Sequence, residues 1–404
     1  MAEECVNSIE IENISGIGRN YCTGCLACIN VCPAQCISVD YDSEGFFWPS
    51  INHKECIRCK KCTKVCQVMF LPQKNSIING YAAAIKNKDI SKESSSGGIF
   101  PALALSFISD GGYVCGAGFC PDLTVRHTVT DKPDNVLNMR GSKYVQSFLS
   151  PDTYTEIEKL LSDGKKVLFV GTPCQVAGMK NRFSQAEGLF CIDLICHGVP
   201  SPVILKKHLE RNYQKAAGRI YSVKFREKTK CENNEFRFVI NTERKKIRVY
   251  ASDDPYYNAF LQGKSFRECC YNCKFASCDR TGDITIGDCA NHKAYSEYFA
   301  YGEVLSTVLI NTSKGIALWN RIKDRLNYVK ADIRREAELN EQLSRPFIRP
   351  AQRDEFYKDF YSMDKSYFES KYVSYLPAKA RLKRTLRRII PLSIKGIIRW
   401  AVKN

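Results

Sequence analysis

Eight cysteines near the start of the chain are spaced as metal ligands. Residues 22–32 and 56–66 share the spacing C-x2-C-x2-C-x3-C. Zinc sites normally use two CxxC pairs about 15 to 20 residues apart or add histidines, and neither run contains a histidine. The doubled spacing therefore favours iron–sulfur ligation over zinc or a disulfide framework. The eight residues are Cys22, Cys25, Cys28, Cys32, Cys56, Cys59, Cys62 and Cys66.

The first run continues into Pro33, and with this residue it closely resembles the bacterial two-cluster ferredoxins. In that family, the first three cysteines of a run bind one 4Fe-4S cluster and the fourth binds the other cluster. The second run has Gln67 in place of the proline, which removes no ligand. Carried over by position, one cluster takes Cys22, Cys25, Cys28 and Cys66, and the other takes Cys56, Cys59, Cys62 and Cys32.

Length and composition indicate a globular protein of two or three domains. The chain has 404 residues, of which 44% are hydrophobic, and it contains 21 cysteines. Its acidic start lacks the basic and apolar regions of a signal peptide, so we expect a cytoplasmic protein whose thiols are reduced. No apolar run approaches the length of about 18 residues that a membrane span requires.

Two short apolar segments, residues 166–170 and 189–195, are predicted to be buried strands of a parallel sheet. A helix is expected between them, which makes a βαβ unit. In such a unit the carboxyl ends of the two strands are neighbours, at the edge of the sheet where ligands bind. We therefore expect Cys174 and Cys196, which follow these strands, to lie at the same edge.

A third group of thiols is predicted at that edge. Cys270 and Cys273 have the spacing of two adjacent ligands of one metal centre, and together with Cys174 and Cys196 they make a four-thiolate site. A zinc site at Cys270 and Cys273 remains open as the alternative. The other cysteines of the core are expected to be small buried hydrophobic side chains.

The elements around these cysteines predict an α/β core with a largely parallel sheet, preceded by a small α+β ferredoxin-like domain. Residues 94–98, rich in serine and glycine, precede an apolar helix over 99–109, and such a loop caps a helix or binds an anion. Residues 236–249 alternate as an antiparallel hairpin. The predicted domains are 1–70 (ferredoxin-like), 71–80 (linker), 81–355 (core) and 356–404 (basic amphipathic helical tail).

Several core motifs, in order, resemble the beta subunit family of coenzyme F-420 hydrogenases and dehydrogenases. They cover residues 94–98, 140–147, 167–178, 196–201 and 270–288. The resemblance implies an iron–sulfur flavoprotein whose core binds FAD and a further 4Fe-4S cluster. The implied flavin-binding residues are Ser95, Ser96, Gly97, Gly98, Lys143, Tyr144, Gly171 and Thr172. The implied ligands of the core cluster are Cys174, Cys196, Cys270 and Cys273.

The function implied is an oxidoreductase that passes electrons between 4Fe-4S clusters and a flavin, which exchanges hydride with a two-electron partner. This partner is coenzyme F-420 or a small or lipid-linked substrate, since similar bacterial proteins are associated with polysaccharide biosynthesis. Soluble ferredoxin or another redox protein is the expected electron-transfer partner. Two alternatives remain: an electron-transfer subunit without its own substrate site, and a non-redox protein with structural metal sites. The sequence identifies no catalytic residue.

The basic charge of the chain is concentrated at its end. The formal net charge is +17, and no acidic residue follows Glu369. From Lys379 to Asn404, basic residues alternate with apolar ones, which predicts two short amphipathic helices separated by Pro391. Each basic residue near an anionic membrane contributes about 1 kcal/mol, so peripheral binding to the inner membrane face and a solvated tail are both open. No nucleic-acid-binding motif is present, so no nucleic-acid partner is expected.

Overall fold

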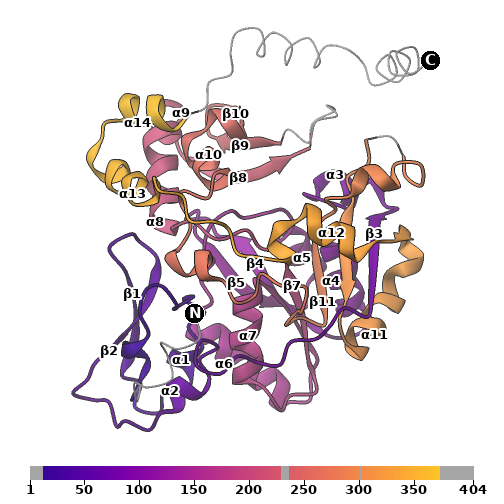
Figure 1. Ribbon diagram of the computed structural model, residues 1–404, viewed down its shortest axis with the longest axis horizontal. Coiled ribbons are helices and arrows are strands. Elements are labelled where there is room, and N and C mark those ends of the chain that lie inside the picture. The colour runs from indigo at the N-terminus through magenta and orange to yellow at the C-terminus, as the bar shows by residue number, and fades with distance from the viewer. Residues whose placement is uncertain (1–11, 229–235, 301, 374–404) are drawn as a thin grey trace.

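The protein, seen here as a computed structural model that describes residues 12–228, 236–300 and 302–373, is built around an eight-stranded sheet (Figure 1). The strands lie in the order β13, β3, β12, β11, β7, β6, β4, β5. Their bounds are β3 Asn79–Ile85, β4 Tyr113–Phe119, β5 Val125–Thr130, β6 Val167–Gly171, β7 Leu189–Leu194, β11 Ile284–Asp288, β12 Ser306–Ile310 and β13 Leu326–Lys330.

The parallel part of this sheet is its centre. Strands β4, β6, β7 and β11 run parallel to their neighbours in this group. At the outside, β5 joins antiparallel to β4, and β12, β3 and β13 follow β11 in antiparallel order. The α/β core is thus as predicted, but the outer strands are antiparallel. Their pairing is set by contacts between segments far apart in the chain, which local patterns do not reveal.

The predicted βαβ unit is present. Helix α7 (Pro173–Arg182) joins β6 to the parallel strand β7, in a register that pairs Gly171 with Asp193. The helix begins two residues before the predicted start because Thr172 is its N-cap and Pro173 occupies its first turn. Gln175 closes this end, since its Oε1 accepts a hydrogen bond from the Thr172 amide nitrogen at 3.1 Å.

Helices cover both faces of the sheet. One hydrophobic cluster joins the sheet to α4 (Ile99–Ser109), α5 (Pro133–Asn138) and α11 (Ser313–Ile322). A second cluster joins the opposite side chains of β4, β6 and β7 to α6 (Pro151–Ser162) and α7. Helices α3 (Lys88–Glu93) and α12 (Ile333–Leu339) lie near the β3 end of the sheet (Figure 1). The helix over 99–109 has the predicted bounds.

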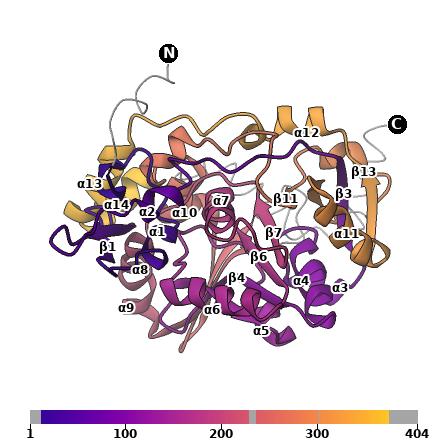
Figure 2. The same cartoon turned by 90° about the horizontal axis from the view of Figure 1, so that it is seen from below.

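The N-terminal unit packs against α6 and α7 (Figure 2). It contains α1 (Ala27–Asn30), the antiparallel hairpin of β1 (Ile37–Tyr41) and β2 (Phe47–Ile51), and α2 (Lys61–Lys64). Cys25, Ala27 and Val65 belong to the same hydrophobic cluster as the two core helices. The first cysteine run is therefore built into the core of the protein.

A smaller three-stranded sheet stands beside the main one. It consists of β8 (Ile220–Glu227), β9 (Arg237–Thr242) and β10 (Lys246–Tyr250), and β9 and β10 form the hairpin predicted for 236–249. One hydrophobic cluster joins this sheet to four helices: α8 (Pro202–Leu209), α10 (Pro255–Leu261), α13 (Arg353–Ser362) and α14 (Lys365–Tyr372). Residues 356–372 of the predicted tail thus pack against this sheet.

The other predictions for the tail, including the amphipathic helices from Lys379 on, concern residues outside the described part of the chain. Within the described part of the chain, no helix is long and apolar enough to cross a membrane. The other short helical segments are η1 Ile14–Gly16, η2 Glu210–Gln214, α9 Lys215–Ala217, η3 Ala251–Asp253, η4 Glu268–Asn272, η5 His292–Tyr295, η6 Lys323–Arg325 and η7 Glu341–Leu343.

Candidate iron–sulfur and flavin sites

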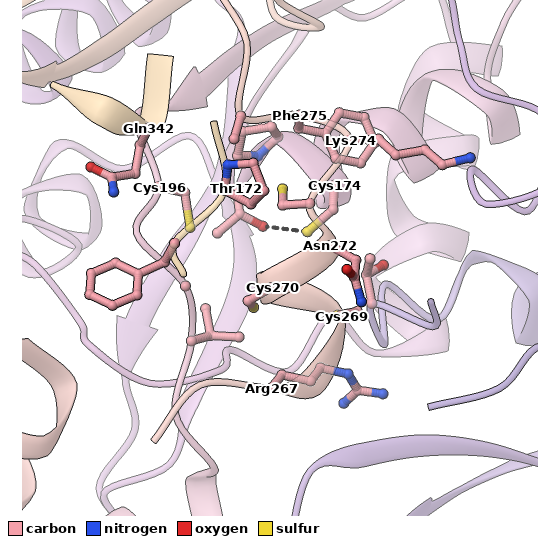
Figure 3. Close-up of a pocket in the computed structure, with 18 of the residues that line it drawn as sticks. Thr172, Cys174, Cys196, Arg267, Cys269, Cys270, Asn272, Lys274, Phe275 and Gln342 are labelled. Atoms are coloured by element: carbon pink, nitrogen blue, oxygen red, sulfur yellow. Dashed lines mark hydrogen bonds between the residues drawn. The ribbon is translucent and has the colours of Figure 1, made fainter. Parts of the chain in front are cut away.

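Five cysteines surround a cavity of about 70 Å³ at the edge of the sheet where β6 and β7 end (Figure 3). We call it the core thiol cavity. Four of its cysteines are the predicted set, Cys174, Cys196, Cys270 and Cys273, and the fifth is Cys269. Cys269 was not predicted to join this group, because the CxxC spacing selects Cys270 and Cys273. The adjacent cysteine pair was visible in the sequence and was the signal for it.

The βαβ unit positions two of these thiols. Cys174 is the second residue of α7, and its Sγ lies 3.2 Å from the Thr172 Oγ1. Cys196 follows two residues after the end of β7. Because β6 and β7 are parallel neighbours, the two cysteines come to the same cavity, as the topology argument predicted.

A buried arginine ties the other cysteine segment to β7. Arg280 is 1% exposed, and its Nη1 donates hydrogen bonds to the carbonyl oxygens of Phe275 and Ser277 at 3.1 and 3.0 Å. Its Nη2 donates to the Leu194 carbonyl at 3.0 Å and lies 3.4 Å from the buried Asp193 Oδ1. The segment after Cys273 is thereby fixed to the strand that precedes Cys196.

The N-terminal cysteines surround two further cavities. One, which we call the inner cavity, is lined by Cys22, Cys25, Cys28 and Cys66. The other, which we call the outer cavity, is lined by Cys32, Cys56, Cys59, Cys62 and also Cys36, whose Sγ lies 3.5 Å from that of Cys32. Each cavity has a volume of about 20 Å³. The grouping is the one predicted, including the exchange of the fourth cysteine between runs.

The chemistry of these donor sets suits a cationic iron cluster. Burial raises the pKa of the Cys28 and Cys174 thiols well above the usual value, and it raises the pKa of Cys66 and Cys196 to about 12. A thiolate at these positions needs a compensating positive charge, which iron ions supply. Among the residues that the structure describes, no group of three histidine, cysteine or acidic side chains converges on a single metal ion.

Arg267 lies between the inner cavity and the core thiol cavity. It is 2% exposed and lines the core thiol cavity. Its Nε donates to the Cys22 carbonyl at 2.8 Å and its Nη1 donates to the Phe47 carbonyl at 2.9 Å. Its guanidinium also lies 5.3 Å from the ring of Phe46 and 5.4 Å from that of Trp48. One cation therefore joins the N-terminal unit to the core beside both sets of thiols.

A fourth cavity, larger than the three thiol cavities, is also lined by Cys174 and has a volume of about 320 Å³, which is in the range of ligand sites. We call it the large cavity. Of the eight residues implied to bind flavin, seven line it: Ser95, Ser96, Gly98, Lys143, Tyr144, Gly171 and Thr172. Gly97 does not. A Cβ at Gly97 would lie 2.2 Å from the Ala83 carbonyl oxygen, so this glycine allows the loop to pack on β3.

The lining of the large cavity fits an anionic cofactor. The N-termini of α4 and α7 both border it, and helix N-termini favour phosphate groups. Burial lowers the pKa of Lys143 to about 7, so an anion beside its ammonium group would favour the charged form. His127 and Gln146 also line the cavity, and each has a buried side-chain nitrogen without a hydrogen-bond partner among the described residues.

The core thiol cavity and the large cavity share a wall. Thr172, Cys174, Cys196 and His197 line both. Burial lowers the pKa of His197, because it disfavours the charged imidazolium. At the far side of the large cavity, Arg226 Nη1 donates to Asp288 Oδ2 at 2.6 Å. The sequence analysis assigned no role to Arg226, His127 or Gln146, because only the folded chain brings them to this cavity.

Two segments of the chain match known protein families. Residues 164–335 match the family described as the C terminus of the coenzyme F420 hydrogenase/dehydrogenase beta subunit, and residues 21–69 match the 4Fe-4S dicluster domain. A chain of the F420-reducing NiFe hydrogenase complex from Methanosarcina barkeri is similar with 21% identity and a TM-score of 0.45. That similarity covers 67% of this chain and 92% of the other. No curated protein matches the chain.

Proposed function

We propose that this chain is an iron–sulfur flavoprotein oxidoreductase. One segment of it matches the C-terminal domain of the coenzyme F420 hydrogenase/dehydrogenase beta subunit, and another matches the 4Fe-4S dicluster domain. The matches establish an iron–sulfur protein of an oxidoreductase family. The proposal adds FAD, a third 4Fe-4S cluster and a hydride partner. That partner is coenzyme F-420 or a small or lipid-linked substrate.

The proposed ligands follow the three thiol cavities. Cys22, Cys25, Cys28 and Cys66 would hold a cluster in the inner cavity, and Cys56, Cys59, Cys62 and Cys32 would hold one in the outer cavity. In the core thiol cavity the ligands would be Cys174, Cys196, Cys270 and Cys273. Cys269 then remains as a fifth thiol beside the cluster.

The large cavity is the proposed FAD site. Bound FAD would supply the exchange between a two-electron hydride transfer and the single electrons that clusters carry. The serine and glycine loop at the N-terminus of α4, together with Thr172 at that of α7, offers amides and hydroxyls for the phosphates. Lys143 would place its ammonium group against them. The buried side chains of His127 and Gln146 would exclude water from the inner end of the site.

The observation that carries the proposal is the wall shared by the core thiol cavity and the large cavity. Cys174 and Cys196 line both, so a cluster held by these thiols would stand directly beside a cofactor in the large cavity. Electron transfer needs such proximity, whereas a structural zinc site does not. The shared wall therefore favours a redox role over the non-redox alternative.

Iron, zinc and FAD content per chain after anaerobic purification tests the proposal. We expect about twelve irons, one FAD and no zinc, because three 4Fe-4S clusters contain about twelve irons. Dithionite should then bleach the flavin absorption in the wild type. About eight irons with one zinc and no flavin would contradict the proposal and would leave the redox chemistry to the N-terminal unit.

A pair of variants tests the shared wall directly. Replacing Cys196 with alanine should remove about four irons, the content of one 4Fe-4S cluster. It should also slow reduction of the flavin by electrons from the N-terminal clusters, because the core cluster between them is lost. Replacing Cys115 with alanine is the matched control. This cysteine of β4 is fully buried between the sheet and helices α6 and α7, and it lines none of the four cavities. If the isolated chain reduces its flavin but turns over no hydride partner, it is an electron-transfer subunit.

A further inference from the structure

Of the three thiol cavities described above, the outer cavity alone has an exposed cysteine in its lining. Cys59 is exposed, and Ile57 beside it is 65% exposed. In the inner cavity, Cys25 and Cys28 are 9% and 8% exposed. If electrons enter or leave the chain through a protein partner, the outer cavity is therefore the place where a partner can approach a cluster.

The surface around this opening is basic. Residues 53–64 carry five exposed basic side chains and one exposed acid, Glu55. Arg58, whose side chain is 73% exposed, also lies 3.6 Å from Glu12. We call the five basic residues and Ile57 the basic rim. The basic members are Lys54, Arg58, Lys60, Lys61 and Lys64.

The basic rim has the composition of a transient protein interface. An exposed apolar side chain, Ile57, lies between charged residues, as in interfaces with an apolar centre and a polar border. Charges of one sign around a binding site steer a partner of opposite sign and raise its association rate by about ten to a thousandfold. The partner that fits this surface is therefore acidic.

We propose that the basic rim is the docking surface for an acidic one-electron carrier protein, which exchanges electrons with the cluster of the outer cavity. This inference rests on the proposed function, because it takes a 4Fe-4S cluster to be present there. In each transfer toward this chain, the reduced carrier loses one electron and the cluster gains it. No covalent bond forms or breaks and no other reactant is required.

The inner cavity lies between the outer cavity and the rest of the proposed electron-transfer path. It and the core thiol cavity are both lined by Thr23, Gln67 and Val68, and the core thiol cavity shares its wall with the large cavity. The outer and inner cavities are in turn joined by one hydrophobic cluster that includes Cys28, Cys36 and Cys62. The basic rim therefore borders the outermost of four neighbouring cavities.

The test uses a variant in which Lys54, Lys61 and Lys64 are all replaced by glutamine. The matched control replaces three exposed lysines by glutamine: Lys92 in α3, Lys293 in η5 and Lys330 at the end of β13. Helix α3 and strand β13 lie at the opposite end of the molecule from α2 (Figure 2), and η5 packs in one hydrophobic cluster with β3. Both variants lose three positive charges. The probe is a reduced acidic two-cluster ferredoxin, mixed with the full chain under anaerobic conditions. The measured quantity is the rate constant with which the ferredoxin reduces the iron–sulfur clusters of the chain, followed by their absorbance change.

We expect the rim variant to lower this rate constant by about tenfold at low ionic strength, and the control variant to change it less than twofold. The wild-type rate constant should fall as salt is added, and that of the rim variant should depend on salt more weakly. Iron content and reduction by dithionite should be unchanged in both variants. Equal rate constants for the rim variant and the wild type would overturn the proposal.

A second arm distinguishes a protein partner from a membrane. Sedimentation with vesicles containing one-third phosphatidylserine should give the same bound fraction for the rim variant as for the wild type. If only vesicle binding falls and the ferredoxin rate constant stays the same, the surface binds lipid and the proposal fails. Failure of the proposed function looks different, because ferredoxin would then reduce the clusters in a rim-dependent manner while the flavin absorption never changed.

Discussion

The two cysteine runs have the same spacing and the same backbone, but opposite surroundings. In both runs the second and fourth residues after the first cysteine have positive φ: Gly24 and Leu26 at 65° and 63°, Arg58 and Lys60 at 53° and 57°. Leu26 is 1% exposed, whereas Lys60 is exposed. The same loop thus serves once as a buried contact with the core and once as a surface. The side chains at matching positions decide which.

The first cysteine run, residues 22–32, faces the core, and we call it the inward run. Specific hydrogen bonds hold it there. Tyr154 in α6 donates its hydroxyl hydrogen to the Cys25 carbonyl at 2.9 Å, and Arg182 in α7 donates to Asn30 Oδ1 at 2.8 Å. Gly178 in α7 leaves room for Cys25, since a Cβ there would lie 2.9 Å from its Sγ. Folding of the core and geometry of the inner cavity should therefore depend on each other. The outer cavity should depend on the core less, because the contacts of the second run with α7 lie at Val65 and Phe70, after its last outer-cavity cysteine.

The sharpest test of this difference replaces one cysteine in each run. Cys25→Ala and Cys59→Ala should each remove about four irons, since each residue is a proposed ligand of one cluster. Both variants should lose the folding free energy that the missing cluster contributes, and Cys25→Ala should lower the free energy of unfolding further, by about 1 kcal/mol or more, because it also leaves an unfilled site in the core. Iron analysis and anaerobic thermal unfolding measure both effects. Equal destabilisation by the two variants would show that the runs do not differ in this way.

Arg267 is the next strongest link between the inward run and the core. Arg267→Met should cost about 3 kcal/mol of unfolding free energy, because it leaves the Cys22 and Phe47 carbonyls without their charged donor. It should also lower the reduction potential of the neighbouring clusters, since a buried positive charge stabilises the reduced state. Arg267→Lys should recover most of the potential and less of the stability. A redox titration followed by electron paramagnetic resonance would contradict this expectation if Met and Lys gave the same potentials.

Gly178→Ala should have a smaller effect. The added methyl group would press on Cys25 and shift the inward run, at a cost of about 1 to 3 kcal/mol. Gly18→Ala is the matched control in the N-terminal unit, where a Cβ would meet nothing within 4 Å. Thermal unfolding and the electron paramagnetic resonance spectrum of the reduced protein report on the two variants. Equal stability of both would mean that the inward run does not press on α7.

The smallest expected effect is kinetic. An iron chelator should remove iron from the outer cavity first, because Cys59 is exposed and the thiols of the inner cavity are buried or half-buried. We expect two phases in the loss of iron–sulfur absorption, with about four irons in the faster one. Cys59→Ala should lack the fast phase. A single phase in the wild type would indicate equal access to the cavities.

The sequence predicted the groups of cysteines but not their orientation. Spacing decides which thiols share a cavity, and the βαβ argument brought Cys174 and Cys196 together correctly. The inward run was recognisable in principle, because Leu26 and Ala27 stand where the other run has Lys60 and Lys61. The helices that it meets were not, since contacts such as that of Tyr154 with Cys25 join segments more than 120 residues apart.

Other parts of the site depend on long-range packing in the same way. The antiparallel pairing of β3 with β12 and β13, and the position of Arg280 against Asp193, follow from the tertiary fold. Gly97 was implied as a flavin contact, but its lack of a side chain is required by the close approach to Ala83. In each case the local motif can be recognised in the sequence, but the segment that packs against it in the fold cannot.

The wall between the core thiol cavity and the large cavity has a thermodynamic consequence. Thr172 and Cys174 border both spaces, so an occupant of one cavity fixes side chains that the occupant of the other requires. Such occupants are linked by a coupling free energy, and the coupling is reciprocal. If the proposed flavin and core cluster occupy these cavities, loss of the flavin should weaken retention of the cluster by the same factor by which loss of the cluster weakens binding of the flavin. The two cofactors would then be gained and lost as a unit.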